Sequence, residues 1–411
     1  MTRKNEHFVH PNRTYIEDAR RLIIRGLESG RITPDDAKLI REFVSEVKSE
    51  SELSGGREYK LVNTAILNRE FLPEYRKVTL ADVRSAKSAL MEATKPDGSP
   101  RFKANTLHDR VNLLKRFMVW MVENNYSEID SIKLRKFHSP RPDKQTKSAA
   151  QMLTEDEILA MVKACRNVRD RALISTLYEG CFRIGEIASM TWKDVHFNDM
   201  NVMINTNFKT GKARNIPIIA SREYLSQWRN DYPGDPTGDN FVFVTIRGAP
   251  MRYASLLKHI RSIAARAGIE KHITLHLFRH SRITALARSG LSESTIKLLA
   301  WGSLETTMMS TYNHITNDDV VNSLEEMNGI VRPEKTRESR KMQPVQCSHC
   351  GNVNSPGMSF CASCGAALNE TGLSQTEAVL EMLKNEMSSN PAFLMEVFQQ
   401  IQNKKSGEAG N

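Results

Sequence analysis

The 411-residue sequence contains no run of about 18 apolar residues, the length that a membrane-spanning helix requires. Its first residues, from Met1 to His7, lead into no apolar segment of the kind found in a secretory signal peptide. We therefore expect no membrane span and a protein that stays in the cytoplasm. Apolar residues make up 40% and charged residues 26% of the chain, which is ordinary for a globular protein, and the length predicts two or three domains.

Positive charge dominates the chain but is unevenly distributed. The formal net charge is +10, whereas residues 366–411 hold three lysines and six glutamates, a net of −3, which leaves +13 for the first 365 residues. A basic body with an acidic tail is typical of a protein that binds a polyanion, most often nucleic acid. Charge alone fits a basic protein without such a partner equally well.

Five side chains, spread over about a third of the chain, have the chemistry needed to cleave a phosphodiester. They are Arg183, His276, Arg279, Trp301 and Tyr312. The two guanidiniums can clamp a phosphate through paired hydrogen bonds, and the imidazole and the indole can donate to its oxygens. The phenol can attack the phosphorus and hold it covalently.

The order and the local sequence of these residues resemble the tyrosine recombinase (phage integrase) family over roughly residues 153–330. The family's G-x-R-x-x-E signature is matched by Gly180 or Cys181, Arg183 and Glu186. Its H-x-x-R-H box is matched by His276, Arg279 and His280.

The resemblance assigns three further residues. Trp301 stands where the family has His or Trp, Tyr312 stands at the nucleophile, and Lys209 resembles the family's hairpin lysine, with Lys212 as the alternative. Trp301 and Tyr312 are eleven residues apart rather than the commonest nine, a spacing closer to that of archaeal members. Ser303 has the commoner spacing but is chemically a poor substitute.

The resemblance implies transesterification at phosphorus without ATP, a catalytic metal or a small-molecule cofactor. Tyr312 would form a 3′-phosphotyrosyl bond, and Lys209 would protonate the leaving 5′-oxygen. Glu186 and His280 would orient the arginine and the histidine from behind. The resemblance also implies double-stranded DNA as the partner, a homotetramer on that DNA, and association with the nucleoid.

Residues 1–130 are expected to form a helical domain. Apolar side chains at helical spacing predict helices near residues 14–30, 83–93 and 105–124. On the last of these, Arg110, Lys115 and Arg116 are expected to remain outside. The arrangement resembles the core-binding domain with which recombinases clamp DNA, and a generic helical bundle is the alternative. Residues 131–150, with two prolines and six basic residues, are expected to be a linker that can follow the phosphate backbone.

Residues 151–330 are expected to form the catalytic domain, mainly α with a small antiparallel sheet. A capping box from Thr154 to Glu157 opens this domain, and helices are expected at 155–165 and 168–178. Strands at 202–206 and 213–218 are expected to form a hairpin around residues 209–212.

A basic linker at residues 331–346 precedes a cysteine module at residues 347–368. Its two C-x2-C pairs are Cys347 with Cys350 and Cys361 with Cys364. This spacing predicts a zinc ribbon with a structural Zn²⁺ bound by four thiolates, and paired disulfides or a redox motif are the alternatives. The two other cysteines, Cys165 and Cys181, lie in apolar helical surroundings and are expected to be core thiols.

Residues 369–411 are expected to form a helical tail, with amphipathic helices near 374–388 and 391–403. Either self-association or packing against the ribbon would cover their apolar faces.

The leading hypothesis is a site-specific recombinase of archaeal type that serves a mobile element as its integrase. Three alternatives remain open: an Xer-type chromosome-dimer resolvase, a type IB topoisomerase, and a non-catalytic DNA-binding protein derived from a recombinase.

Overall fold

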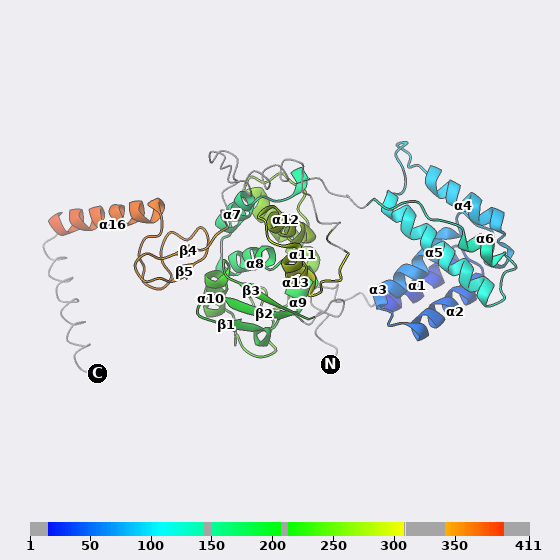
Figure 1. Ribbon diagram of the computed structural model, residues 1–411, viewed down its shortest axis with the longest axis horizontal. Coiled ribbons are helices and arrows are strands. Elements are labelled where there is room, and N and C mark those ends of the chain that lie inside the picture. Colours follow the sequence, from blue (N-terminus) through cyan, green and yellow to red (C-terminus); the bar gives the residue numbers. More distant parts are fainter. Residues whose placement is uncertain (1–14, 144–148, 207–212, 308, 310–341, 390–411) are drawn as a thin grey trace. The chain divides into compact units, whose positions relative to one another are not determined.

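The structure is a computed structural model, and it describes residues 15–143, 149–206, 213–307, 309 and 342–389 (Figure 1). The chain divides into two compact units, one of residues 9–146 and one that begins at residue 147. Each unit has its own buried apolar core, as expected of separately packed domains.

The first unit is helical throughout its described part, residues 15–143. Its helices are α1 (Tyr15–Glu28), α2 (Pro34–Glu50), α3 (Gly55–Asn68), the short η1 (Tyr75–Lys77), α4 (Leu80–Glu92), α5 (Ala104–Glu123) and α6 (Ser131–Arg135). Their apolar faces meet around Phe43, Phe117 and Trp120, whose ring centroids lie 5.1–5.6 Å apart. The amphipathic pattern of the sequence therefore closes into one core.

Reciprocal caps begin α2 and α4. The N–H of Asp36 donates to Thr33 Oγ1 at 3.1 Å, and the N–H of Thr33 donates to the Asp36 carboxylate at 3.0 Å. Thr79 and Asp82 form the same pair. Each box provides partners for backbone N–H groups that the first helical turn leaves unpaired.

The expectation that Arg110 lies on the outer face of α5 is wrong. Arg110 is 6% exposed, its Nε donates to Asn68 at 3.3 Å, and its guanidinium lies 4.5 Å from the ring centroid of Phe102. Arg116, by contrast, is exposed. Helical periodicity identifies the face that meets other helices, but it cannot show that Phe102, in the loop before α5, covers part of the opposite face.

The segment expected to be a linker, residues 131–150, begins with helix α6. Leu134 on this helix is fully buried in the core of the first unit. Lys115, which was expected outside, is half-buried and donates to the carbonyls of Arg135 and Phe137, both at 2.6 Å. The first unit therefore extends to residue 146 rather than to residue 130. The basic composition of the segment concealed its one core leucine.

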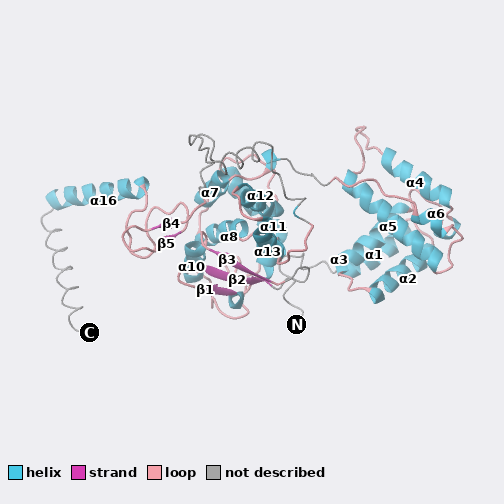
Figure 2. Ribbon diagram, in the orientation of Figure 1, coloured by secondary structure: helices cyan, strands magenta, loops and turns pink. Residues whose placement is uncertain are grey.

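The second unit is mainly α with a small antiparallel sheet, as the sequence predicts (Figure 2). Its helices are η2 (Ala149–Gln151), α7 (Glu155–Lys163), α8 (Val168–Glu179), α9 (Ile184–Ser189), η3 (Trp192–Asp194), α10 (Arg222–Asn230), α11 (Tyr253–Arg266), α12 (Leu275–Arg288), α13 (Glu293–Trp301) and α16 (Glu370–Ser389). Strands β1 (Val195–Phe197), β2 (Val202–Thr206) and β3 (Arg214–Ile218) form a sheet in sequence order. The hairpin register pairs Thr206 with Arg214, whereas β1 and α10 were not predicted.

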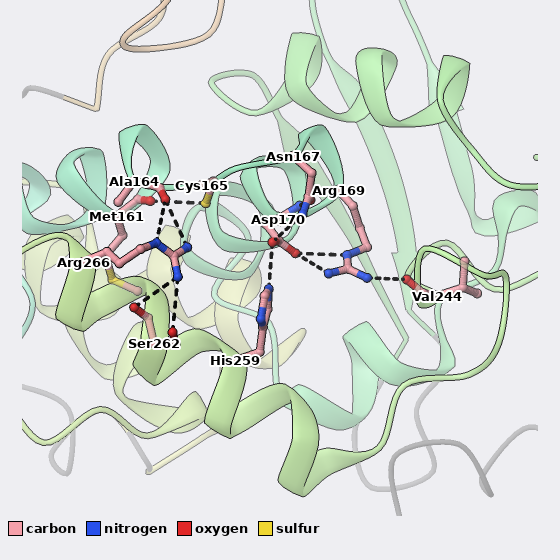
Figure 3. Close-up of polar contacts among 10 residues, drawn as sticks. All are labelled: Met161, Ala164, Cys165, Asn167, Arg169, Asp170, Val244, His259, Ser262 and Arg266. Atoms are coloured by element: carbon pink, nitrogen blue, oxygen red, sulfur yellow. Dashed lines mark hydrogen bonds and ion pairs between the residues drawn. The ribbon is translucent and has the colours of Figure 1, made fainter.

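A buried carboxylate connects three segments of this unit (Figure 3). Asp170, near the start of α8, is 1% exposed and accepts hydrogen bonds from Arg169 and from His259 on α11, both at 2.7 Å. Arg169 also donates to the carbonyl of Val244. Although burial opposes it, these donors hold the pKa of the Asp170 carboxyl below its usual value.

The cysteine module contacts two helices of this unit, α7, which precedes the three-stranded sheet, and α10, which follows it. Its strands β4 (Val345–Gln346) and β5 (Val353–Asn354) pair antiparallel. Beyond β5, the carbonyl of Pro356 accepts a 2.6 Å hydrogen bond from the Tyr224 hydroxyl on α10. At Gly357 (φ 83°), a side chain would begin 2.8 Å from Leu159 on α7. Both the backbone conformation and the space therefore favour glycine at this contact.

Helix α16 exposes the apolar residues that the sequence places on one face. Val379 is 49% exposed, Leu380 50% and Leu383 42%, so the ribbon does not cover them. The second tail helix expected at 391–403 lies outside the described residues. Within the described part of the chain, every helix is too short or too polar to cross a membrane.

Candidate active site

Arg183 and Glu186 form a closed pair at the start of α9. The backbone N–H of Arg183 donates to Glu186 Oε2 at 2.7 Å, and Arg183 Nη1 donates to Oε1 at 3.0 Å. The Glu186 side chain is 2% exposed, whereas the Arg183 side chain is 28% exposed. The carboxylate thus holds the guanidinium from the buried side and leaves it at the surface.

Arg279, in the middle of α12, connects the first motif to α13. Its side chain is fully buried; Nη2 donates to the carbonyl of Ala300 at 2.7 Å, and Nη1 donates to the carbonyl of Cys181. Its guanidinium carbon also lies 5.1 Å from the centroid of the Trp301 ring. Arg279, Cys181 and Trp301 are far apart in the sequence, and the fold brings them into contact.

Trp301 is the last residue of α13 and is 7% exposed. It packs with Cys181, Ile283 and Ile296 in a small cluster separate from the main core of the unit. Gly302 follows in the left-handed conformation (φ 68°), which ends the helix. The indole is thereby held beside Arg279.

The two histidines of the second motif lie one turn apart on α12. Their ring centroids are 4.7 Å apart and their planes are nearly perpendicular. His276 is exposed, whereas His280 is 7% exposed. His280 is thus the buried member of the pair and His276 the exposed one.

Three of the residues assigned from the sequence lie outside the described residues: Lys209, its alternative Lys212, and Tyr312. The fold brings Arg183, Glu186, Arg279 and Trp301 together, with His276 and His280 on the same helix as Arg279. The chemical role of each remains a prediction.

One arginine of this cluster was not predicted as a site residue. Arg214 begins β3 and is 3% exposed; its Nη2 donates to Glu186 Oε2 at 2.5 Å. A signal was present in the sequence, because Arg214 shares the buried face of β3 with Ile216 and Ile218. A cation on an otherwise apolar strand face requires a buried counter-ion.

The four cysteines of the C-terminal module form a candidate metal centre. Their Sγ atoms all lie within 4.8 Å of one another, with 3.7 Å between Cys347 and Cys364 and 3.5 Å between Cys350 and Cys361. Tetrahedral thiolates at about 2.3 Å from a metal would be about 3.8 Å apart, so the spacing fits one ion. All four cysteines are free thiols in the structure, which differs from the disulfide alternative.

The two halves of this centre repeat one backbone pattern. Gly351 N–H donates to the Cys347 carbonyl and Gly365 N–H to the Cys361 carbonyl, both at 2.9 Å and both with a left-handed glycine. Although burial opposes it, backbone N–H groups of Cys364 and Ser363 lower the pKa of the Cys361 thiol to about 6. A thiolate at neutral pH is the form that binds a metal.

Comparison with known proteins identifies the domain that carries the arginine cluster. The model of the phage integrase family matches residues 151–318. Transposase A from transposon Tn554 of Staphylococcus aureus is 31% identical over 193 residues, which is 43% of this chain and 52% of the transposase. The tyrosine recombinase XerD of Ralstonia nicotianae is 28% identical over 221 residues, which is 52% of this chain and 70% of XerD.

Solved structures agree on the fold. A lambda integrase tetramer bound to a Holliday junction is similar with a TM-score of 0.51 and 16% identity, covering 67% of this chain and 76% of that one. The Tn1549 transposon integrase in complex with a circular intermediate DNA is similar with a TM-score of 0.51 and 15% identity, covering 70% and 99%. At this identity the likeness concerns the fold alone.

The sequence matches cover only part of the relatives, since the chain spans about half the length of the transposase. They nevertheless converge on the domain in which the two motifs meet. Residues 151–318 therefore carry a domain of the phage integrase family.

Proposed function

We propose that this chain is a site-specific DNA recombinase that acts as an integrase and cleaves and rejoins DNA through Tyr312. The observation that carries the proposal is the convergence of Arg183, Arg279 and Trp301 around buried backbone carbonyls and one buried carboxylate. Glu186 accepts hydrogen bonds from both Arg183 and Arg214, and Arg279 lies buried against the carbonyls of Cys181 and Ala300. Guanidiniums gathered in this way suit a phosphate.

In the proposed reaction, a DNA phosphodiester binds beside Arg183, whose guanidinium is held by Glu186 and reaches the surface. The pentacoordinate transition state carries more negative charge than the ground state, so arginine donors stabilise it selectively. Arg279 contributes from beneath, where burial strengthens its field. His276, exposed on the same helix, donates to the same phosphate or helps to deprotonate the nucleophile.

The bonds balance without an external energy source. The Tyr312 phenolate oxygen forms a bond to phosphorus, the bond from phosphorus to the 5′-oxygen breaks, and Lys209 gives a proton to that oxygen. The phosphate ester is thereby retained as a 3′-phosphotyrosyl bond. Attack by the 5′-hydroxyl of another strand reverses the step and releases Tyr312.

A covalent trapping assay tests this function. Nicked DNA from the flanks of the coding locus is incubated with the protein, the mixture is denatured, and protein–DNA adducts are resolved on a gel. We expect an adduct with the wild type and with Tyr253→Phe, a control tyrosine on α11, and none with Tyr312→Phe. If a wide pool of sites gives no adduct, the non-catalytic DNA-binding alternative takes precedence.

The four cysteines are proposed to hold a structural Zn²⁺. Four thiolates with two matching turns form a closed site with no position left for substrate. The ion would stabilise the fold of residues 347–368, a segment with too little apolar core to fold alone. The proposed catalysis uses no metal.

The proposal also includes the biological role and the assembly of the protein. The similarity to a transposase and to a transposon integrase favours a mobile-element integrase, and the similarity to XerD keeps chromosome-dimer resolution as the second candidate. Assembly as a tetramer on DNA is supported by the tetrameric lambda integrase of similar fold. A DNA substrate implies a cytoplasmic, nucleoid-associated protein. The archaeal type rests on the spacing of Trp301 and Tyr312 alone.

A further inference from the structure

Arg214 occupies a position that connects three parts of the candidate active site. It is the first residue of β3 and pairs with Thr206 across the hairpin, so it lies at the base of the segment that carries Lys209. From there its guanidinium reaches Glu186 on α9 and the carbonyl of Leu299 on α13. The side chain itself is 1% exposed, so it cannot contact DNA directly.

The end of α13 is held by two arginines. Arg214 donates to the carbonyl of Leu299, and Arg279 donates to the carbonyl of the next residue, Ala300. The last carbonyls of a helix have no partner within the helix. Two cations on consecutive carbonyls therefore hold the end of α13, and with it Trp301, in place. They also complement the negative end of the helix dipole.

Arg214 and Arg183 share one carboxylate, that of Glu186. The Glu186 carboxylate accepts from Arg183 through Oε1 and from Arg214 through Oε2. If Arg214 were neutral, Arg183 would be the nearest remaining partner for a buried negative charge. The field that Arg183 exerts on a phosphate would then be largely cancelled.

Burying the Arg214 guanidinium costs free energy, so its presence at this position needs a reason other than packing. Burial lowers the pKa of the Arg214 guanidinium, and the neighbouring charges of Arg279 and Arg183 act in the same direction, with Glu186 opposing them. Its Nε has no hydrogen-bond partner among the described residues. An apolar residue would fill this place on the strand face at lower cost if only packing mattered.

We propose that Arg214 is a positioning residue of the recombination site: it neutralises Glu186, so that Arg183 keeps its charge for the phosphate, and it holds the end of α13 that carries Trp301. This inference rests on the proposed function. It assigns Arg214 no contact with DNA and no part in proton transfer.

The test compares cleavage rates at saturating DNA with DNA affinity. Arg214→Met removes the charge but keeps much of the side-chain volume. We expect it to lower the rate of adduct formation by about 100-fold, the effect of a displaced catalytic group, while the Kd for DNA changes less than about threefold. Arg214→Lys restores a charge but cannot reach both acceptors, so its rate should lie between those of Arg214→Met and the wild type.

The decisive variant removes the carboxylate as well. Glu186→Gln in the Arg214→Met background eliminates the charge that Arg214 neutralises, and we expect it to recover at least about tenfold in rate. Arg169→Met is the matched control, because it breaks another buried arginine–carboxylate pair, that of Arg169 and Asp170 at the start of α8. Its effect on rate should follow the folded fraction measured by thermal unfolding.

The possible results separate the two proposals. An adduct from Arg214→Met at the wild-type rate would overturn this inference alone. A second result would also overturn it: the rate of Arg214→Met falls with the folded fraction, as in the Arg169→Met control, and adding Glu186→Gln does not raise it. The absence of an adduct with the wild-type protein would overturn the proposed function and this inference together.

Discussion

Arg279 donates a hydrogen bond from Nη1 to the backbone carbonyl of Cys181, a residue whose φ of 50° lies in the left-handed region. Among the described residues only Asn125 shares such a φ without being glycine. The left-handed conformation directs the Cys181 carbonyl at Arg279 but costs a residue with a Cβ roughly 1–2 kcal/mol. The strain is thus located where the two motifs of the family meet.

At Cys181, a glycine variant should therefore be more stable than an alanine variant, the reverse of the usual order of stability. Both Cys181→Gly and Cys181→Ala remove the buried thiol, but only glycine relieves the backbone, so we expect the glycine variant to be the more stable by about 1 kcal/mol. Urea unfolding of both variants measures the difference. Cys165, which is buried without a positive φ, is the control: there alanine should be the more stable. Equal stability of the two Cys181 variants would contradict a strained backbone.

Gly180 is required for a different reason, namely space. A Cβ at this position would lie 2.2 Å from the ring of Phe182, which is fully buried. We expect Gly180→Ala to lower the free energy of unfolding by about 1–3 kcal/mol, because the ring must leave its place. The partner change Phe182→Leu removes the obstructing ring atoms. The double variant should therefore lose less stability than the two single changes together, and strict additivity in urea unfolding would argue against the clash.

Asp170 provides a test of buried charge and its pH dependence. Asp170→Asn leaves Arg169 buried without its counter-ion, and we expect a loss of about 3 kcal/mol at neutral pH. The folded pKa of Asp170 lies below the unfolded value of 3.8, so its stabilisation is present above that value and is lost as the pH falls through the folded pKa. The difference in unfolding free energy between wild type and variant, measured by urea unfolding, should therefore narrow as the pH falls below 3.8. A difference that grows in this acidic range would contradict the prediction.

The cysteine cluster should hold one zinc ion per chain. Metal analysis of the purified protein should give this ratio, and Cys350→Ser or Cys361→Ser should lower it, because either change removes one of four ligands. Cys165→Ser is the matched control and should leave the ratio unchanged, since burial raises the pKa of this thiol to about 12 and it lies in the apolar core. Loss of zinc from Cys165→Ser, or none in the wild type, would refute the assignment.

Chelation should also loosen the contact between the cysteine module and helix α10. The 2.6 Å hydrogen bond from Tyr224 to Pro356 is buried, so Tyr224→Phe leaves a carbonyl without its donor and should cost about 1 kcal/mol when zinc is bound. After chelation the loop that carries Pro356 loses its support, and the variant and the wild type should become equally stable by thermal unfolding. A difference that persists in the chelated protein would mean that the loop holds its place without the metal.

Local signals in the sequence predicted much of this structure. The capping boxes at Thr33, Thr79 and Thr154 involve residues three apart, so they operate before any tertiary contact forms. The C-x2-C pairs behave in the same way, because each pair is close through its own turn. The mainly α fold class with its small sheet was also predicted correctly from hydrophobic spacing.

Spacing along the chain was insufficient wherever a distant segment decides the environment. Arg110 was expected in solvent, but Phe102 and Asn68 bury it; residues 131–135 were expected in a linker, but Leu134 joins the core of the first unit. A polar residue on a helix or strand carries no local mark of the partner that will cover it. The same limit concealed Arg214, whose partners lie on α9 and α13.

The sequence by itself determined which side chains are available: two arginines and a histidine in family motifs, a tryptophan, a tyrosine and four paired cysteines. It also determined the helices on which those side chains lie within the described residues, because capping and hydrophobic periodicity depend on residues close together in the sequence. Only the tertiary structure decided that Glu186 lies between Arg183 and Arg214, and that Arg279 is buried against the carbonyls of Cys181 and Ala300. The physical reason is that a buried charge depends on what surrounds it in three dimensions, and those surroundings come from four segments separated by dozens of residues.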